Sequence, residues 1–140
     1  MWVRPMENRD IDAVNALEQK CFTGEAWSEA MISNMFSNGY DKVYVLENDG
    51  RVIGYVNTRD IGGDVDLMSI CVDPAEQGKG YGKLLMERVM ANPYKTMMLE
   101  VRESNARAIA LYEKYGFQKF ARRKEYYTSP VEDAIIMRIS

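Results

Sequence analysis

Histidine is absent from this chain of 140 residues, and cysteine occurs only twice. Without histidine the chain lacks the commonest general base and a frequent metal ligand, so acid–base chemistry must use Asp, Glu, Tyr, Cys, Lys or the substrate itself. The two cysteines, Cys21 and Cys71, lie in unlike contexts and form no Cys-x-x-Cys pair. The sequence therefore argues against a disulfide framework and against a zinc site, and we expect no bound metal.

Long apolar runs are absent as well. No stretch approaches the roughly 18 apolar residues of a transmembrane helix, and the N-terminus runs directly into charged sequence without the apolar core of a signal peptide. The formal net charge of −3 lacks the basic excess that is typical of nucleic-acid binders. We therefore expect a cytoplasmic protein whose partners include neither a membrane nor a nucleic acid. Its mild acidity would tolerate a cationic substrate.

The sequence contains the short strand-like and helix-like segments of one globular domain spanning residues 1–140, without repeats or linkers. The expected elements are a strand at 3–5, helices at 11–21 and 28–36, strands at 43–47, 52–58 and 65–72, a helix after residue 82, a strand at 95–102, a helix at 105–115 and strands near 117–127 and 134–139. This order, β-α-α-β-β-β-α-β-α-β-β, predicts an α/β (α+β) fold with a mixed, mostly antiparallel sheet and helices on both faces.

Local signals refine this pattern. Turn signals at 48–50 and 62–63 predict that the three middle strands form an antiparallel meander. In the third of these strands, strict alternation over 65–72 places odd-numbered residues on one face and even-numbered residues on the other.

The helix starts carry their own signals. Asp10, Ser28 and Ser104 are the expected N-caps of three helices. Trp27 is positioned to pack against Ile32 as a hydrophobic staple.

The segment 77–83, Gln-Gly-Lys-Gly-Tyr-Gly-Lys, lies between a strand end and a helix start. Its glycines let the backbone approach a ligand closely, and the free N–H groups of the helix start favour an anion. A pyrophosphate is the expected ligand, and Lys79 and Lys83 add positive charge. The competing interpretation is a plain strand-to-helix turn with glycines kept for packing. The residues concerned are Gly78, Lys79, Gly80, Tyr81, Gly82 and Lys83.

Two other glycine motifs do not fit this loop. A Walker loop requires Ser or Thr after Gly-Lys, and Gly82-Lys83 is followed by Leu84. The dinucleotide fingerprint requires G-x-G-x-x-G after a parallel strand, whereas the spacing here is G-x-G-x-G after an antiparallel meander. The remaining spacing, Q-x-x-G-x-G, resembles the acyl-CoA loop of the GCN5-related N-acetyltransferase (GNAT) superfamily. The strand before it, 70–74, resembles the strand that pairs with the pantetheine arm in that family.

Three residues beyond the loop are candidates for chemistry. Glu100 lies on the same strand face as Arg102 among large apolar neighbours, a setting in which a carboxylate could act as a general base. A structural carboxylate held by Arg102 is the alternative. Tyr112 lies on the inward face of the following helix and could donate a proton, or it could simply belong to the core. Asn105 could bind a coenzyme or serve as a second capping residue.

The resemblance becomes more specific in the second half of the chain. The motifs LEVRxSN at 99–105, LYxxxGF at 111–117 and EDAxxM at 132–137 resemble the bacterial ribosomal-protein-alanine N-acetyltransferases of the RimI type. So do Trp27-Ser28 and the combination of Arg123 with Tyr126-Tyr127. The likeness extends over nearly the whole chain. Two departures are Gly78, where relatives often carry arginine, and 25–26, where an aromatic residue and a proline are expected.

This resemblance implies an acetyltransferase that uses acetyl-CoA as cosubstrate and needs no metal. It implies Glu100 as proton acceptor, Tyr112 as proton donor and the N-terminal alanine of a small-subunit ribosomal protein as acceptor. Coenzyme contacts are implied for Ile70, Cys71, Val72, Gly78, Lys79, Gly80, Tyr81, Gly82, Lys83 and Asn105.

Two alternatives stay open. The acceptor could be a small amine or a lysine side chain, or the protein could be a non-catalytic CoA-binding module. Cys71 is interpreted as a strand residue rather than a nucleophile, because no cationic neighbour in the adjacent sequence would lower the pKa of its thiol.

Overall fold

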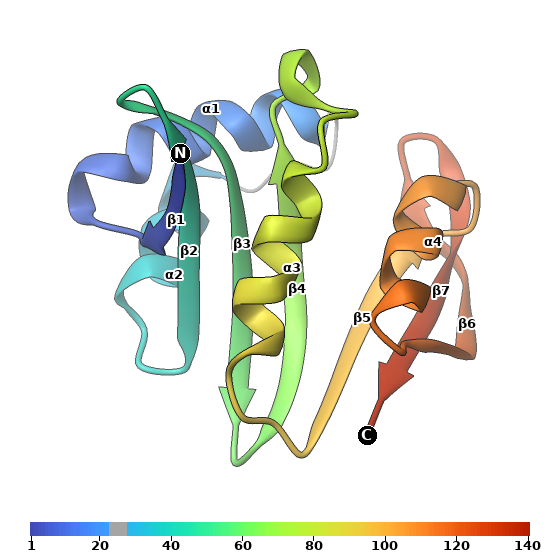
Figure 1. Cartoon of the computed structure of the whole chain (residues 1–140). Coiled ribbons are helices and arrows are strands. Elements are labelled where there is room, and N and C mark those ends of the chain that lie inside the picture. Colours follow the sequence, from blue (N-terminus) through green and yellow to red (C-terminus); the bar gives the residue numbers. More distant parts are fainter. Residues whose placement is uncertain (23–27) are drawn as a thin grey trace.

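The computed structural model describes residues 1–22 and 28–140. Within these residues the chain forms one seven-stranded sheet in the order β1-β2-β3-β4-β5-β7-β6 (Figure 1). Neighbouring strands are antiparallel except β4 and β5, which run parallel. The strands are β1 (Trp2–Pro5), β2 (Asp41–Asn48), β3 (Arg51–Ile61), β4 (Asp64–Val72), β5 (Thr96–Arg102), β6 (Gln118–Thr128) and β7 (Val131–Ile139).

Helices cover both faces of this sheet. The helices are α1 (Ile11–Cys21), α2 (Glu29–Ser37), α3 (Tyr81–Met90) and α4 (Ala106–Lys114), with short 3-10 turns η1 (Asn8–Asp10) and η2 (Pro74–Glu76). On one face, α1 and α2 share an apolar cluster that includes Val14, Ile32 and Tyr55. On the other, α3 and α4 share a cluster that includes Leu85 and Ile109. The predicted fold class and order of helices and strands are confirmed.

The hairpin turns follow the sequence signals. Asp49 and Gly50 both have positive φ, 52° and 75°, as the tight turn between β2 and β3 requires. Gly62 and Gly63, at φ 65° and 94°, connect β3 to β4 in the same way. These two turns produce the predicted antiparallel meander.

One of the three predicted helix caps is confirmed and two are corrected. The Ser28 side chain accepts a hydrogen bond from the Met31 amide at 3.2 Å. Asp10 occupies the N-cap position of α1, but its carboxylate binds Arg4 and the Glu7 amide instead of α1. The N-cap of α4 is Asn105, not Ser104, because Asn105 Oδ1 accepts from the Ala108 amide at 3.1 Å.

The Trp27 staple and the departure at 25–26 lie outside the described residues. No helix within the described ranges is long and apolar enough to cross a membrane.

A β-bulge at Met68 overturns the predicted alternation of β4. Thr58 pairs with Leu67 and Asn57 pairs with Ser69, so Met68 is left over in the ladder. An extra residue reverses the faces beyond it. Val65 and Leu67 accordingly pack on the α3 side, whereas Cys71 packs on the α1 side.

The cysteines depart from the sequence-based expectation. Cys21, the last residue of α1, is joined to Cys71 of β4 by a disulfide, with the Cα atoms 6.5 Å apart. The prediction that no disulfide forms was wrong because it rested on sequence spacing alone. Packing of α1 against β4 places the helix end over Cys71, which the bulge has turned to this face.

Candidate active site

The site is a cleft of about 1520 Å³ that opens where β4 and β5 separate. The two parallel strands are paired only from Asp64–Thr96 to Leu67–Leu99. Figure 1 shows them together at their lower ends and diverging toward the upper ends, with α3 and α4 on either side. Because the strands part after Leu67, residues of both strands line the space between them.

Beyond Leu67, β4 presents backbone groups to this cleft. It keeps β3 as a partner from Ser69 to Val72, and no strand of the described chain pairs with its other edge there. An unpaired strand edge offers N–H and C=O groups to an extended ligand. The predicted contacts Ile70, Cys71 and Val72 all line the cleft. Cys71 is buried and disulfide-bonded, consistent with a strand residue rather than a nucleophile.

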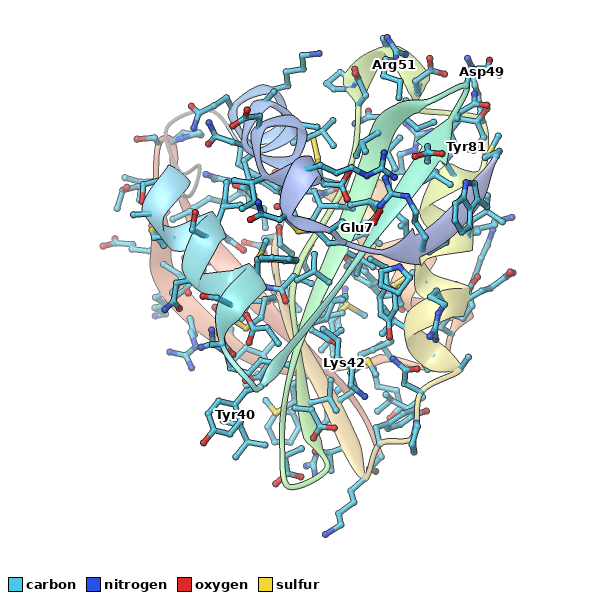
Figure 2. The ribbon with its side chains drawn as sticks, turned by 90° about the vertical axis from the view of Figure 1, so that its left-hand side faces the viewer. Glu7, Tyr40, Lys42, Asp49, Arg51 and Tyr81 are labelled. Atoms are coloured by element: carbon cyan, nitrogen blue, oxygen red, sulfur yellow. A yellow bond between two sulfur atoms is a disulfide. The ribbon has the colours of Figure 1, made fainter. Side chains whose placement is uncertain are left out.

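The glycine loop forms one end of the cleft. Gly78 and Gly80 have φ of 85° and 83°, values that favour glycine. Gly80 is the N-cap of α3, so the amides of the first turn that follow it have no partners within the helix. Together with the helix dipole, these amides could bind an anion. Figure 2 shows Tyr81 at the end of α3 where this turn begins.

The cations at this end are not those expected from sequence alone. Lys83 lines the cleft, but Lys79 does not, and its Nζ lies 2.7 Å from Glu76 Oε2. Arg107 of α4 also lines the cleft, and its guanidinium lies 3.4 Å from where a Cβ at Gly78 would be. A side chain of α4 therefore places positive charge beside the glycine loop.

Asn105, the N-cap of α4, and Tyr112 of the same helix both line the cleft. The Asn105 side chain caps α4 through its oxygen, which leaves its amide nitrogen as a donor. Tyr112 is buried, and burial raises the pKa of its hydroxyl well above the usual range, with the Tyr127 hydroxyl as a minor cause. No hydrogen-bond partner of the Tyr112 hydroxyl is present among the described residues. Tyr112 is therefore protonated at neutral pH and able to donate.

Glu100 lines the opposite side of the cleft, and its partner differs from the one considered from sequence. Arg123 Nε of β6 lies 3.5 Å from Glu100 Oε1, and the Glu100 side chain is 31% exposed. Arg102 instead binds Glu132 and the carbonyl oxygens of Ser129 and Pro130. Glu100 is therefore a half-exposed, ion-paired carboxylate rather than a desolvated one.

Two further carboxylates lie on the α1 side of the cleft with Glu100. Asp66 of β4 lines it, and loss of hydration, followed by the nearby Glu100 charge, raises the pKa of Asp66. Glu18 of α1 is 1% exposed and also lines the cleft. The cleft thus has a cationic end at the glycine loop and an acidic side at α1, β4 and β5.

The EDAxxM segment at 132–137 holds the backbone around the cleft, and its Glu132 also lines the cleft. Glu132 accepts from the Ser104 amide at 2.6 Å and from Arg102. Asp133 accepts from the Glu125 amide, where the chain has a positive φ of 51°. These bonds fix the turn between β5 and α4 and the irregular part of β6.

Of the predicted site residues, the structure brings Glu100, Tyr112, Asn105 and every coenzyme contact except Lys79 to one cleft. Sequence reasoning missed Arg107, Glu18 and Asp66, and it quoted Arg123 without assigning it a role. No local pattern singles out these four, since each reaches the cleft only because distant elements pack together.

Comparison with known proteins gives the family. The chain matches the Acetyltransferase (GNAT) family over residues 11–117. The ribosomal protein bS18-alanine N-acetyltransferase of Escherichia coli (strain K12) is 34% identical over 143 residues, covering 98% of this chain and 95% of that protein. The protein of the same name from Haemophilus influenzae is 32% identical over 142 residues, covering 96% and 95%.

A solved structure agrees with these relatives. The crystal structure of the ribosomal-protein-S18-alanine N-acetyltransferase from Escherichia coli has a TM-score of 0.90 and 33% identity, covering 98% of this chain and 91% of that one. The chain therefore belongs to the GNAT acetyltransferase family and is an acetyl-CoA-dependent N-acetyltransferase.

Proposed function

We propose that this enzyme acetylates the N-terminal α-amine of a protein, and that its acceptor is the N-terminal alanine of ribosomal protein bS18. The names of the relatives that match nearly the whole chain support this acceptor. A ribosomal acceptor also supports a cytoplasmic location. The observation that carries the chemistry is the polarity of the cleft, cationic at the glycine loop and acidic on the α1 side.

The cleft offers a binding group for each part of acetyl-CoA. Its pyrophosphate would take the amides of the Gly80 turn, with Lys83 and Arg107 supplying charge. Its pantetheine amides would pair with the unpaired edge of β4. In this arrangement the thioester would lie where β4 and β5 separate, in the cleft that Glu100 and Tyr112 both line.

The acceptor amine must lose a proton before its nitrogen can attack. An α-amine has a pKa of about 7.7–8.0, well below that of lysine, so roughly a tenth is already neutral at pH 7. In the protonated fraction, Glu100 takes one proton from the ammonium group, directly or through water. The amine nitrogen then bonds to the thioester carbon while a β4 amide near Cys71 stabilises the charge on the carbonyl oxygen.

Breakdown of this adduct breaks the carbon–sulfur bond. Tyr112, whose hydroxyl keeps its proton because it is buried, protonates the departing thiolate of CoA. The products are the acetylated amine and free CoA. The attacking nitrogen carries two hydrogens, so the adduct loses one of them to the tyrosinate left on Tyr112, which restores its hydroxyl. Glu100 returns the first proton to solvent.

The test compares two peptides in an assay of acetyl-CoA-dependent thiol release. One begins with a free alanine α-amine, and the other has a blocked N-terminus and free lysines. Turnover of the first peptide alone is the expected result. Turnover of the lysine peptide alone would contradict the assigned acceptor.

Two variants test the proposed roles of Glu100 and Tyr112. We expect Glu100→Gln and Tyr112→Phe to lose turnover by about a hundredfold or more while CoA binding, followed by calorimetry, is retained. If both variants turn over like the unmodified enzyme, the proposed roles are wrong.

A further inference from the structure

Glu18 is a carboxylate in the cleft that the mechanism above does not use. It lies in the last two turns of α1, is 1% exposed, and still contributes to the cleft lining. Burying a carboxylate is unfavourable unless hydrogen bonds compensate for the lost hydration. One such bond comes from Ser69 Oγ, which donates to Glu18 Oε1 at 3.2 Å.

Ser69 connects Glu18 to a third residue. Its Oγ lies 2.8 Å from the hydroxyl of Tyr55, which is fully buried. A serine hydroxyl has one hydrogen and two lone pairs. Because the hydrogen goes to Glu18, the bond with Tyr55 must use the tyrosine hydrogen. Ser69 Oγ then keeps one lone pair, and no other described residue occupies it.

The Met68 bulge directs the Ser69 hydroxyl to the acidic side of the cleft, where the proposed function expects the acceptor amine. Before the bulge, the odd-numbered residues of β4 pack toward α3. After the bulge, the odd-numbered residues Ser69 and Cys71 face α1 instead. Ser69 is partly exposed and lines the cleft, as Glu100 does from β5. Ser69 on β4 and Glu100 on β5 therefore form two walls of this acidic side.

We propose that Ser69 binds the acceptor amine with this lone pair and that Glu18 acts through Ser69 as a positioning residue. The proposal deepens the proposed function and depends on an amine acceptor. A protonated α-amine has three N–H donors, so it can contact Ser69 on one wall and Glu100 on the other. By accepting the Ser69 hydrogen at 3.2 Å, Glu18 polarises the hydroxyl and makes the Ser69 oxygen a stronger acceptor.

This arrangement separates two tasks. Glu18 and Ser69 hold the nitrogen on the β4 wall, next to the edge where the thioester is expected, while Glu100 removes the proton. Loss of Ser69 or Glu18 should therefore weaken acceptor binding more than it slows the step after binding. A purely structural role would lower stability and leave the kinetics of the folded enzyme unchanged.

The experiment measures acceptor KM, kcat and CoA affinity for Ser69→Ala, Glu18→Gln and the conservative Ser69→Thr. The acceptors are the α-amine peptide, the N-blocked lysine peptide and a small diamine. Thr58→Val is the matched control, because it also removes a buried hydroxyl from this sheet, one that donates to the Lys42 carbonyl and lies outside the cleft lining. Thermal melts establish that each variant is folded.

We expect Ser69→Ala and Glu18→Gln to raise the acceptor KM by about tenfold, with kcat and CoA affinity changed by less than about threefold. Ser69→Thr should restore most of the loss, and Thr58→Val should leave the acceptor KM unchanged. Unchanged acceptor KM in folded Ser69→Ala and Glu18→Gln would overturn the proposal.

Comparing the three acceptors distinguishes failure of the Ser69 and Glu18 proposal from failure of the proposed function. If the unmodified enzyme prefers the lysine peptide or the diamine, the α-amine assignment fails, and the variants are judged on the amine that is turned over. If no amine is turned over, binding of the α-amine peptide to the CoA complex is compared instead. Equal affinity across the variants would then overturn the role of Ser69 and Glu18.

Discussion

Glu100 Oε1 and Arg123 Nε lie 3.5 Å apart across β7, which runs between their two strands. The guanidinium holds the proposed base at the cleft without burying it, since the Glu100 side chain is 31% exposed. Arg123 itself lines the cleft. The ion pair thus connects β6, at the edge of the sheet, to the cleft.

Removing this contact should impair catalysis. We expect Arg123→Gln to lower kcat/KM by about tenfold, because a misplaced base reacts less efficiently. The neighbouring Arg122 is the matched control, since it pairs with Glu103 and Asp133 and does not line the cleft. Steady-state kinetics of Arg123→Gln and Arg122→Gln decide the matter. Equal losses in both variants would show that β6 is needed only as a structural edge.

Arg107 should contribute to coenzyme affinity through the phosphates. Arg107→Ala is expected to raise the Kd for acetyl-CoA by about tenfold, because a charge-assisted hydrogen bond is lost. Acetyl-pantetheine, which has no pyrophosphate, should bind both forms equally. Lys79→Ala serves as control, since Lys79 pairs with Glu76 and does not itself line the cleft. An equal loss for acetyl-pantetheine would mean that Arg107 acts on the shape of the site rather than on phosphate.

The pH dependence of kcat should reflect the buried state of Tyr112. Burial raises the pKa of its hydroxyl above the ordinary value of 10.0, so the donor keeps its proton throughout the neutral and moderately alkaline range. We expect no loss of kcat from this group below about pH 10. Because an unfolded tyrosine ionises first, the associated stability is present below that pH and declines only above it.

Tyr112→Phe tests the same assignment at fixed pH. The variant should lose about a hundredfold in kcat, whereas Tyr115→Phe, which removes a bond to the Lys83 carbonyl, should remain active. Both are measured at saturating substrates from pH 7 to about 10. A decline in kcat in the unmodified enzyme from well below pH 10 that disappears in Tyr112→Phe would contradict a raised pKa.

The buried ion pair of Arg4 and Asp10 should stabilise the fold at neutral pH. Arg4 Nη1 lies 2.7 Å from Asp10 Oδ2, and both side chains are buried. We expect Asp10→Asn to lower the free energy of unfolding by about 3 kcal/mol, because the Arg4 charge then loses its main partner. Urea unfolding at pH 7 measures this difference.

The same pair predicts how the difference varies with pH. The Arg4 hydrogen bond, above all, lowers the pKa of Asp10 below 3.8. Its contribution is therefore present above that value and is lost as the pH falls through the folded-state pKa. Asp12→Asn, a change at an exposed position of α1, is the control. An Asp10→Asn deficit that persists undiminished at pH 2 would contradict this account.

Features encoded by adjacent residues were predictable from the sequence. The turns at Asp49-Gly50 and Gly62-Gly63 and the Ser28 cap depend on local backbone conformation, and each was placed correctly. The glycine loop was located for the same reason. The element order followed from periodicities of apolar residues, which local segments carry in full.

Features that depend on distant partners were not predictable. The Met68 bulge arises from pairing with β3, and the disulfide from packing of α1 on β4. Asp10 was expected to cap α1, but a buried arginine of β1 competes for its carboxylate. Arg107 reaches the glycine loop only because α3 and α4 lie on the same face of the sheet.

The most direct test of the account uses a single acceptor peptide that carries both a free N-terminal alanine and an internal lysine. After reaction with acetyl-CoA, fragmentation mass spectrometry locates the acetyl group on one nitrogen or the other. The account predicts acetylation of the α-nitrogen, with the lysine unmodified and with loss of the product in Glu100→Gln. Acetylation of the lysine ε-nitrogen, with the α-amine left free, would contradict it.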